Sequence, residues 1–243
     1  MIFIKSMLAF GLTFISMLSL VPFGFPAYLL GFLGLRKPMT WVVYWIAHFW
    51  AKGVIFIAGC IMRVEGRENI PKGNGVCFVS NHEGVFDVIL ALAYIGKPFG
   101  FIAKKELLFL PFFNMWIYIL GGLFIDMKNI RKAIKTINTG IKKIQAGNNM
   151  LIFPEGTRSK GRGLLPFRSG AIKLATNSLA PIVPVAITGS FEVVEKNWRG
   201  VRPVPVRIIF CPPIITADMS ADERRHKLPD NVRSIIEEAL ARP

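Results

Sequence analysis

The sequence predicts an α/β fold with a mostly parallel central sheet flanked by helices, preceded by a hydrophobic helical hairpin that anchors the chain to a membrane. Two observations support this prediction. Residues 6–35 carry no charge and 52% of all residues are hydrophobic, which exceeds the norm for soluble domains. Beyond residue 63, short apolar strands alternate with helical patterns. We therefore expect an anchor over residues 1–62 and an α/β domain over residues 63–243.

The first apolar segment is interrupted midway by Pro22, Gly24 and Pro26, which break or kink a helix. A short helix up to Val21 followed by a second piece fits this pattern, and so does one span of the bilayer. A second apolar stretch, residues 40–62, is rich in the Trp and Tyr rings that favour membrane interfaces. A cleaved signal peptide would begin similarly, but no cleavage site is well placed, so the sequence favours an uncleaved anchor.

The charge balance indicates an acidic partner, because 30 Lys and Arg against 15 Asp and Glu give a net charge of +15. Anionic lipid head groups fit better than nucleic acid, since most aromatic residues lie in apolar runs. Cys60, Cys77 and Cys211 are widely spaced among apolar residues, which indicates neither a disulfide framework nor a zinc site. We expect them to be core residues in a reducing compartment, and we expect no metal site.

The elements of the α/β domain follow from periodicity and turn residues. Strands are expected over residues 75–80, 99–103, 123–127, 150–153, 182–187 and 206–211, and helices over 85–94, 111–120, 169–178 and 221–241. The clearest helix runs from about residue 130 to 144, with five isoleucines on one stripe and basic residues largely elsewhere. We expect its apolar stripe to pack on the core, and membrane contact by its basic face is the secondary interpretation.

A histidine and a carboxylate stand five positions apart in the stretch from Asn81 to Asp87. His82 can take and return a proton near neutral pH, and Asp87 can orient the ring and stabilise its charged form. The same stretch also fits the start of a helix, with Ser80 or Asn81 as the N-cap and Asp87 as a solvated acid. This stretch alone favours a catalytic base and a helix cap equally.

A second polar stretch, Phe153-Pro154-Glu155-Gly156-Thr157-Arg158-Ser159, follows the strand expected at 150–153. Its glycine lets backbone approach a ligand, and its arginine offers a planar fork that matches phosphate oxygens. Alone, it is more simply a basic surface turn. Both stretches, however, follow the carboxyl ends of expected strands, where ligands gather in open parallel sheets. They are therefore expected to share one cleft, in which a base activates a hydroxyl of a lipid substrate.

The sequence resembles the lysophosphatidic acid acyltransferase family (1-acyl-sn-glycerol-3-phosphate O-acyltransferases) over roughly residues 60–215. Asn81-His82 and Asp87 match the NHxxxxD (HX4D) motif of this family, and residues 153–159 match its FPEGTRS motif. Weaker similarities lie in three blocks: Lys104 to Leu107 with Pro111, Gly122 to Asp126, and Val183-Pro184-Val185. The resemblance implies a glycerolphosphate acyltransferase-like fold and a membrane enzyme of phospholipid biosynthesis with its catalytic domain on the cytoplasmic side.

The resemblance also implies the reaction. His82, oriented by Asp87, would deprotonate the sn-2 hydroxyl of lysophosphatidic acid, which attacks the thioester of acyl-CoA or acyl-carrier protein and gives phosphatidic acid. No cofactor, metal or covalent acyl-enzyme is implied. Four residues would hold the acceptor's phosphate and a fifth would organise their loop: Lys104, Gly156, Thr157 and Arg158, with Glu155 as the organiser.

Three positions depart from the family pattern. Gly84 stands where serine is common, Asn114 where glycine is common, and Met127 where arginine often follows the Asp126 position. Because Met127 removes a cation, an acyltransferase for another lyso-lipid, such as lyso-ornithine lipid, is an alternative. Glu83 adds a carboxylate beside the expected base. A lipid hydrolase is disfavoured because no G-x-S-x-G stretch occurs, and a non-enzymatic membrane-binding protein is the remaining alternative.

Overall fold

The computed structural model describes residues 11, 15–16, 18–30, 33, 35–110, 112–196 and 203–242. Within them, seven strands form one sheet in the order β1-β7-β6-β2-β5-β3-β4. The strands are β1 (Ile61–Glu65), β2 (Cys77–Ser80), β3 (Phe99–Lys104), β4 (Leu123–Ile125), β5 (Asn149–Ile152), β6 (Ile182–Thr188) and β7 (Pro205–Phe210). The helices are α2 (Val21–Leu30), α3 (Arg36–Ile57), α4 (Phe86–Tyr94), α5 (Phe113–Ile119), α6 (Ile130–Gln145), α7 (Ser169–Asn177), α8 (Ser190–Val194), α9 (Ala221–His226) and α10 (Leu228–Ala241).

The sheet is mostly parallel, as predicted. β2 pairs in parallel with both β5 and β6, and β3 pairs in parallel with β5 and β4. Only the pair of β6 and β7 is antiparallel among the described strands, and β1 runs parallel to β7. Five neighbouring strands therefore end at the same edge of the sheet, and the loops that follow β2, β5 and β6 leave that edge side by side.

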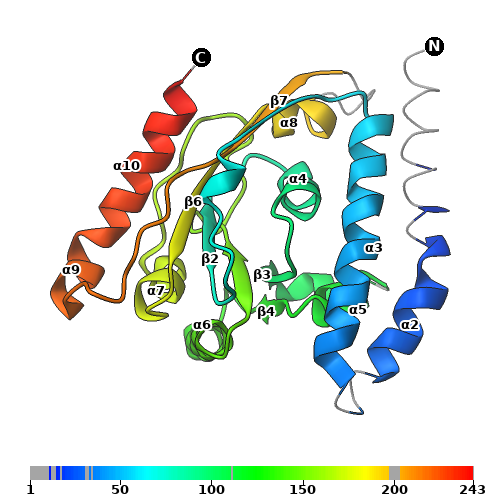
Figure 1. Cartoon of the computed structure of the whole chain (residues 1–243), viewed down its shortest axis with the longest axis horizontal. Coiled ribbons are helices and arrows are strands. Elements are labelled where there is room, and N and C mark those ends of the chain that lie inside the picture. Colours follow the sequence, from blue (N-terminus) through cyan, green and yellow to red (C-terminus); the bar gives the residue numbers. More distant parts are fainter. Residues whose placement is uncertain are drawn as a thin grey trace.

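Two hydrophobic cores, one on each face, make the protein a three-layer structure (Figure 1). α3, α4 and α5 cover one face, and α6, α7 and α10 cover the other. Within β2, Phe78 belongs to the first core, whereas Cys77 and Val79 belong to the second. This alternation is the normal consequence of a pleated strand buried on both sides, and it fixes the position of the loop that begins after Ser80.

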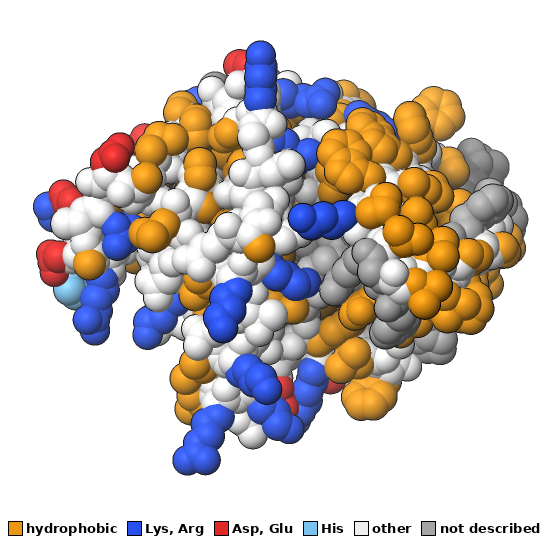
Figure 2. All heavy atoms as spheres, turned by 60° about the horizontal axis from the view of Figure 1, so that its bottom comes forward, with side chains coloured by type: hydrophobic (Ala, Val, Ile, Leu, Met, Phe, Trp, Pro, Cys, Tyr) orange, Lys and Arg blue, Asp and Glu red, His pale blue; other side chains and the backbone are white. Residues whose placement is uncertain are grey.

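The N-terminal helices combine a packed side with an apolar exposed side. α3 buries Val43 and Tyr44 in the core that it shares with α4. Its segment Lys37–Ile57 is long and apolar enough to cross a membrane, and 33% of its most apolar window is buried. Phe49 and Phe56 are 69% and 86% exposed. Figure 2 shows hydrophobic side chains gathered on the side of the molecule where α2 and α3 lie, which indicates membrane association.

The expected break in the first apolar segment is placed by the structure at a turn at Leu20, just before α2. Pro22 then lies in the first turn of α2, where its missing N–H costs little, and Pro26 lies inside the helix. Most of the helix expected before Val21 is outside the described residues, as is Pro111. The expected boundary at residue 62 falls inside β1, which begins at Ile61.

Two expectations about single elements need correction. The terminal helix of residues 221–241 is two helices, because Pro229 in the first turn of α10 cannot donate to the preceding turn. The isoleucine stripe of α6 is buried at Ile137 and Ile144, but Ile130 is 76% exposed and Ile134 is 55% exposed. The first turns of α6 therefore extend beyond the elements that cover its later turns.

The cysteines are free thiols, as expected. Cys77 and Cys211 are buried and Cys60 is half-buried. Burial raises the pKa of the Cys60 and Cys211 thiols to about 11, so these thiols are protonated at neutral pH and act as core residues.

Candidate active site

The loop after β2 is tied to the neighbouring strand by Asn81. Its side chain donates to the carbonyl of Ile187 in β6 and accepts from the N–H of the same residue, both at 2.8 Å. The loop then runs to α4, whose N-cap position is Val85 and has no side-chain cap. The helix-cap interpretation of Asn81 is therefore wrong, because its side-chain amide forms hydrogen bonds with the backbone of β6.

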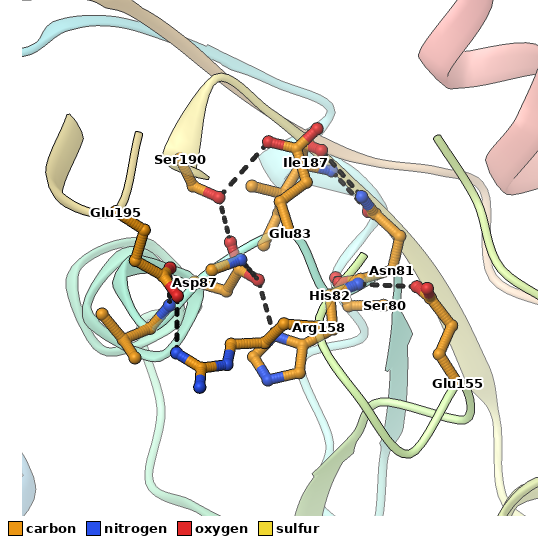
Figure 3. Close-up of polar contacts among 12 residues, drawn as sticks. Ser80, Asn81, His82, Glu83, Asp87, Glu155, Arg158, Ile187, Ser190 and Glu195 are labelled. Carbon is orange, nitrogen blue, oxygen red and sulfur yellow. Dashed lines mark hydrogen bonds and ion pairs between the residues drawn. The ribbon is translucent and has the colours of Figure 1, made fainter. Parts of the chain in front are cut away.

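Asp87 lies in the first turn of α4 and is completely buried. His82 Nδ1 is 2.7 Å from its Oδ2 atom, which also accepts the Gly84 N–H at 3.0 Å. The Ser190 hydroxyl donates to its Oδ1 atom. A carboxylate with these donors is a fixed acceptor rather than a solvated acid. It holds the His82 ring with Nδ1 protonated, and Nε2 remains available to accept a proton (Figure 3).

The His82 ring is supported on one face by Phe153, the first residue after β5. The two rings are stacked, with centroids 4.1 Å apart and an angle of 21° between their planes. The His82 side chain keeps 19% of its surface exposed. The ring therefore has a fixed orientation and still reaches solvent, as a proton acceptor for a bound substrate requires.

Glu155 joins the loop after β5 to the loop after β2. Its Oε1 atom accepts the His82 N–H at 2.8 Å, and its Oε2 atom accepts the Leu165 N–H at 3.1 Å. The residue is 2% exposed. Burial raises the pKa of this carboxyl, whereas the two N–H donors lower it. Backbone bonds from Ser159 N to His82 O and from Lys160 N to Glu83 O complete the contact between the loops.

The other predicted residues lie at the same edge with differing surroundings. Gly156 adopts φ +66°, and a Cβ there would lie 2.7 Å from the side chain of Arg168, so any other residue would be strained at this position. Thr157 is exposed. Arg158 is 40% exposed and forms an ion pair with Glu195. Lys104 ends β3, two strands away from β2 in the sheet, and its side chain is exposed.

The site includes three further residues. Ser190 and Glu195 were not predicted from the sequence, and Glu83 was noted without an orientation. Ser190 begins α8 directly after Gly189, which turns the chain at φ +84°. Glu83, whose orientation the sequence left open, points toward Ser190, with its Oε2 atom 3.4 Å from the hydroxyl. Glu195 follows α8. The one available signal was position, because Gly189 and Ser190 follow the carboxyl end of β6 as His82 follows that of β2.

The environment of Glu83 favours its protonated form. Burial raises its pKa to about 7, and the adjacent Asp87 carboxylate contributes to the increase. N–H groups of Phe191 and Gly189 and the Ser190 hydroxyl act in the opposite direction. Glu83, Ser190, Asp87 and His82 thus form one continuous polar row (Figure 3).

The site offers acid-base chemistry next to a cationic loop. Across the described ranges, no group of three or more His, Cys, Asp and Glu side chains could hold a metal ion. A His-Asp pair with a partly exposed imidazole, beside an arginine-bearing turn, is the arrangement expected of the class of enzymes that activate a hydroxyl group.

The comparison with known families agrees with this class. A family model described as "Acyltransferase" matches residues 61–188, which include both motifs. The chain belongs to this acyltransferase family.

The names of individual relatives are more specific than the description of the family. The chain is 35% identical over 185 residues to a 1-acyl-sn-glycerol-3-phosphate acyltransferase of Limnanthes douglasii, with 75% of this chain and 63% of that protein covered. It is 33% identical over 170 residues to the Salmonella typhimurium protein of the same name, with 70% and 68% covered. The crystal structure of the 1-acyl-sn-glycerophosphate (LPA) acyltransferase PlsC from Thermotoga maritima matches with a TM-score of 0.80 and 26% identity, over 100% of this chain and 99% of that one.

Proposed function

We propose that this protein transfers a fatty acyl group from a thioester to the sn-2 hydroxyl of lysophosphatidic acid, which gives phosphatidic acid. The observation that carries the proposal is the hydrogen bond between His82 and the buried Asp87, next to the Arg158 loop. The names of the relatives support the same acceptor.

The proposed reaction requires one base and no covalent enzyme intermediate. His82 Nε2 takes the proton of the acceptor hydroxyl while its Nδ1–H donates to Asp87, which stabilises the imidazolium. The hydroxyl oxygen forms a bond to the thioester carbonyl carbon, whose oxygen takes up the electron pair. When the tetrahedral intermediate collapses, the carbon–sulfur bond breaks and the thiolate receives the proton from His82. An ester and a free thiol result, without a metal or another cofactor.

The acceptor's phosphate fits the basic loop after β5. Arg158 offers a fork of N–H donors, Thr157 a hydroxyl, and the Gly156 turn close access to the backbone. Lys104, at the end of β3, would meet the phosphate or the donor as an exposed cation. Glu155 would keep this loop against the base, since it already holds the N–H groups of His82 and Leu165.

The donor and the location follow from charge and hydropathy. Acyl-CoA and acyl-carrier protein are both acidic thioesters, which suits a chain of net charge +15. The exposed apolar surface of α2 and α3, with basic residues elsewhere on the same face (Figure 2), suits a cell membrane with anionic head groups. We place the α/β domain on the cytoplasmic side, where both donors occur.

The test is acyl transfer by the purified full chain in mixed micelles, with lysophosphatidic acid and acyl-CoA. We expect His82→Ala to lower kcat by about a thousandfold. His226→Ala is the matched control, since His226 pairs with Asp222 on the exposed α9 and should leave the rate unchanged. Transfer at the wild-type rate by a folded His82→Ala protein would overturn the proposal.

One observation favours a second class of acceptor lipid. A Cβ on Gly156 would lie 3.5 Å from the Met127 methyl group, so this apolar side chain lies beside the loop that is proposed to hold the phosphate. The same chemistry on another lyso-lipid, such as lyso-ornithine lipid, would need less positive charge there. A panel of lyso-lipid acceptors distinguishes the two, because a higher kcat/KM with an acceptor that has no phosphate would favour the second class.

A further inference from the structure

Glu195 contributes a carboxylate to the site that the proposed reaction does not use. Its Oε1 atom pairs with Arg158 Nη1 at 2.5 Å, and its Oε2 atom accepts the N–H of Val85 at 2.8 Å. The Glu195 side chain is 17% exposed, against 40% for Arg158. The carboxylate is thus fixed by the backbone that leads into α4, and the arginine is held by the carboxylate (Figure 3).

The pairing occupies only part of the guanidinium. One N–H of Arg158 donates to Glu195, and a guanidinium has five N–H donors in a rigid plane. Ser159, the next residue, donates its N–H to the carbonyl of His82 at 2.7 Å, so Arg158 begins beside the His82 loop. Its guanidinium is held at Glu195, whose other carboxylate oxygen accepts the N–H of Val85, three residues after His82 (Figure 3). The remaining donors can therefore meet an anion bound next to the base.

Gly84 explains how this carboxylate enters the site. A Cβ at this position would overlap Glu195 Oε2 and would lie 3.2 Å from Phe191 Cα. Any side chain at residue 84, including the serine common in the family, would displace the carboxylate from the Val85 N–H. The departure at Gly84 and the carboxylate of Glu195 are therefore two parts of one arrangement.

We infer that Glu195 is a positioning residue that holds Arg158 in place for the phosphate of the acceptor, and that Gly84 provides the space for it. This inference deepens the proposed function and rests on it. A free arginine side chain loses much rotational freedom when it binds, whereas a fork that is already fixed loses less. Glu195 acts through Arg158 and does not touch the reacting atoms.

The first test compares Glu195→Gln with wild type in the acyl-transfer assay, with lysophosphatidic acid varied at saturating acyl-CoA. Glutamine keeps the size of the side chain but has no negative charge, and its NH2 group cannot accept the hydrogen bond that one of the two carboxylate oxygens accepts. We expect KM for lysophosphatidic acid to rise about fivefold, which is the magnitude expected for the loss of a partly exposed ion pair. We expect kcat to stay within about twofold of the wild-type value. Glu192→Gln is the control, because it removes a carboxylate of α8 that pairs with Lys196.

The second test is a double-mutant cycle with Glu195→Ala and Gly84→Ala, with folding of each variant checked by circular dichroism. If Gly84 serves to admit the carboxylate, Gly84→Ala raises KM in the wild-type background and adds little when Glu195 is already alanine. The contact with Phe191 is present in both backgrounds and cancels in the cycle.

The outcomes separate this inference from the proposed function. Unchanged KM in Glu195→Gln, with normal transfer by the wild type, would overturn the positioning role alone. A fall in KM would also overturn it, because the carboxylate would then compete with the phosphate. Additive effects in the cycle would overturn the role of Gly84. Absence of transfer to lysophosphatidic acid by the wild type would overturn the proposed function and this inference together.

Discussion

Glu83 makes the stability of this protein depend on pH in a direction that can be measured. Its pKa is raised from the ordinary value of 4.5 to about 7, first by burial and then by the adjacent Asp87 carboxylate. The folded protein therefore binds this proton more tightly than the unfolded chain. The stabilisation is fully present below pH 4.5 and is lost as the pH rises through 7. Glu83→Gln keeps the neutral form at every pH and should escape this loss.

The size of the effect follows from the displacement of the pKa. At 1.36 kcal/mol per pKa unit, the full displacement corresponds to about 3 kcal/mol, and screening at this partly exposed group reduces it to about 1–2 kcal/mol. For a chain of this length, each kcal/mol changes Tm by about 2–4 °C. We expect Glu83→Gln to match the wild type near pH 4.5 and to melt about 3–6 °C higher at pH 8.

The assay is thermal unfolding of the full chain in detergent, followed by circular dichroism between pH 4.5 and 8. Glu68→Gln is the control, since Glu68 is an exposed carboxylate on the short helical turn Arg67–Asn69. A difference between Glu83→Gln and wild type that stays constant over this range would refute the linkage between Glu83 and stability. If the Tm of Glu83→Gln fell relative to that of the wild type as the pH rises, the predicted direction of the pH dependence would be refuted.

Three further predictions concern the polar groups around the base. Asp87→Asn should lower kcat by about a thousandfold, because an amide in place of the carboxylate favours the wrong tautomer of His82; a loss below tenfold in steady-state kinetics would contradict this role. Ser190→Ala should cost about 1–3 kcal/mol of unfolding free energy, since it leaves the buried Asp87 short of a donor, and restoration by threonine would identify the hydroxyl as the cause. Asn81→Ala removes two hydrogen bonds to the Ile187 backbone and should lower the unfolding free energy by about 2–3 kcal/mol in urea titrations; an unchanged midpoint would show that the bridge to β6 contributes nothing.

Much of the fold could be predicted because the strands are short apolar runs bounded by turn residues. The directions of the strands could be predicted only in part. Nothing in the local sequence of Pro205–Phe210 distinguishes a strand that runs antiparallel to β6 from one that runs parallel, since periodicity is the same in both directions. β1 was missed because Ile61–Glu65 follows a long apolar helix almost directly. The division between α9 and α10 was readable, since Pro229 marks it.

The site was predicted to the extent that its residues occupy two motifs at strand ends. His82 and Glu155 were expected to share a cleft, and the direct hydrogen bond between them fits that expectation. Ser190 follows a strand end as His82 does, but it lies in neither motif, and Glu195 has no such signal. The importance of both residues arises from side-chain contacts across the sheet edge. The burial of Asp87 was also not readable, since a first-turn acid is normally solvated.

The contacts that assemble the base also determine when the enzyme can first act during its synthesis. The bond from the His82 amide to Glu155 spans 73 residues, and the bridge from Asn81 to Ile187 spans 106. Contacts of such large separation form late in folding. The apolar helices α2 and α3 are therefore translated long before β6, so that the base can be assembled only after these helices have been made.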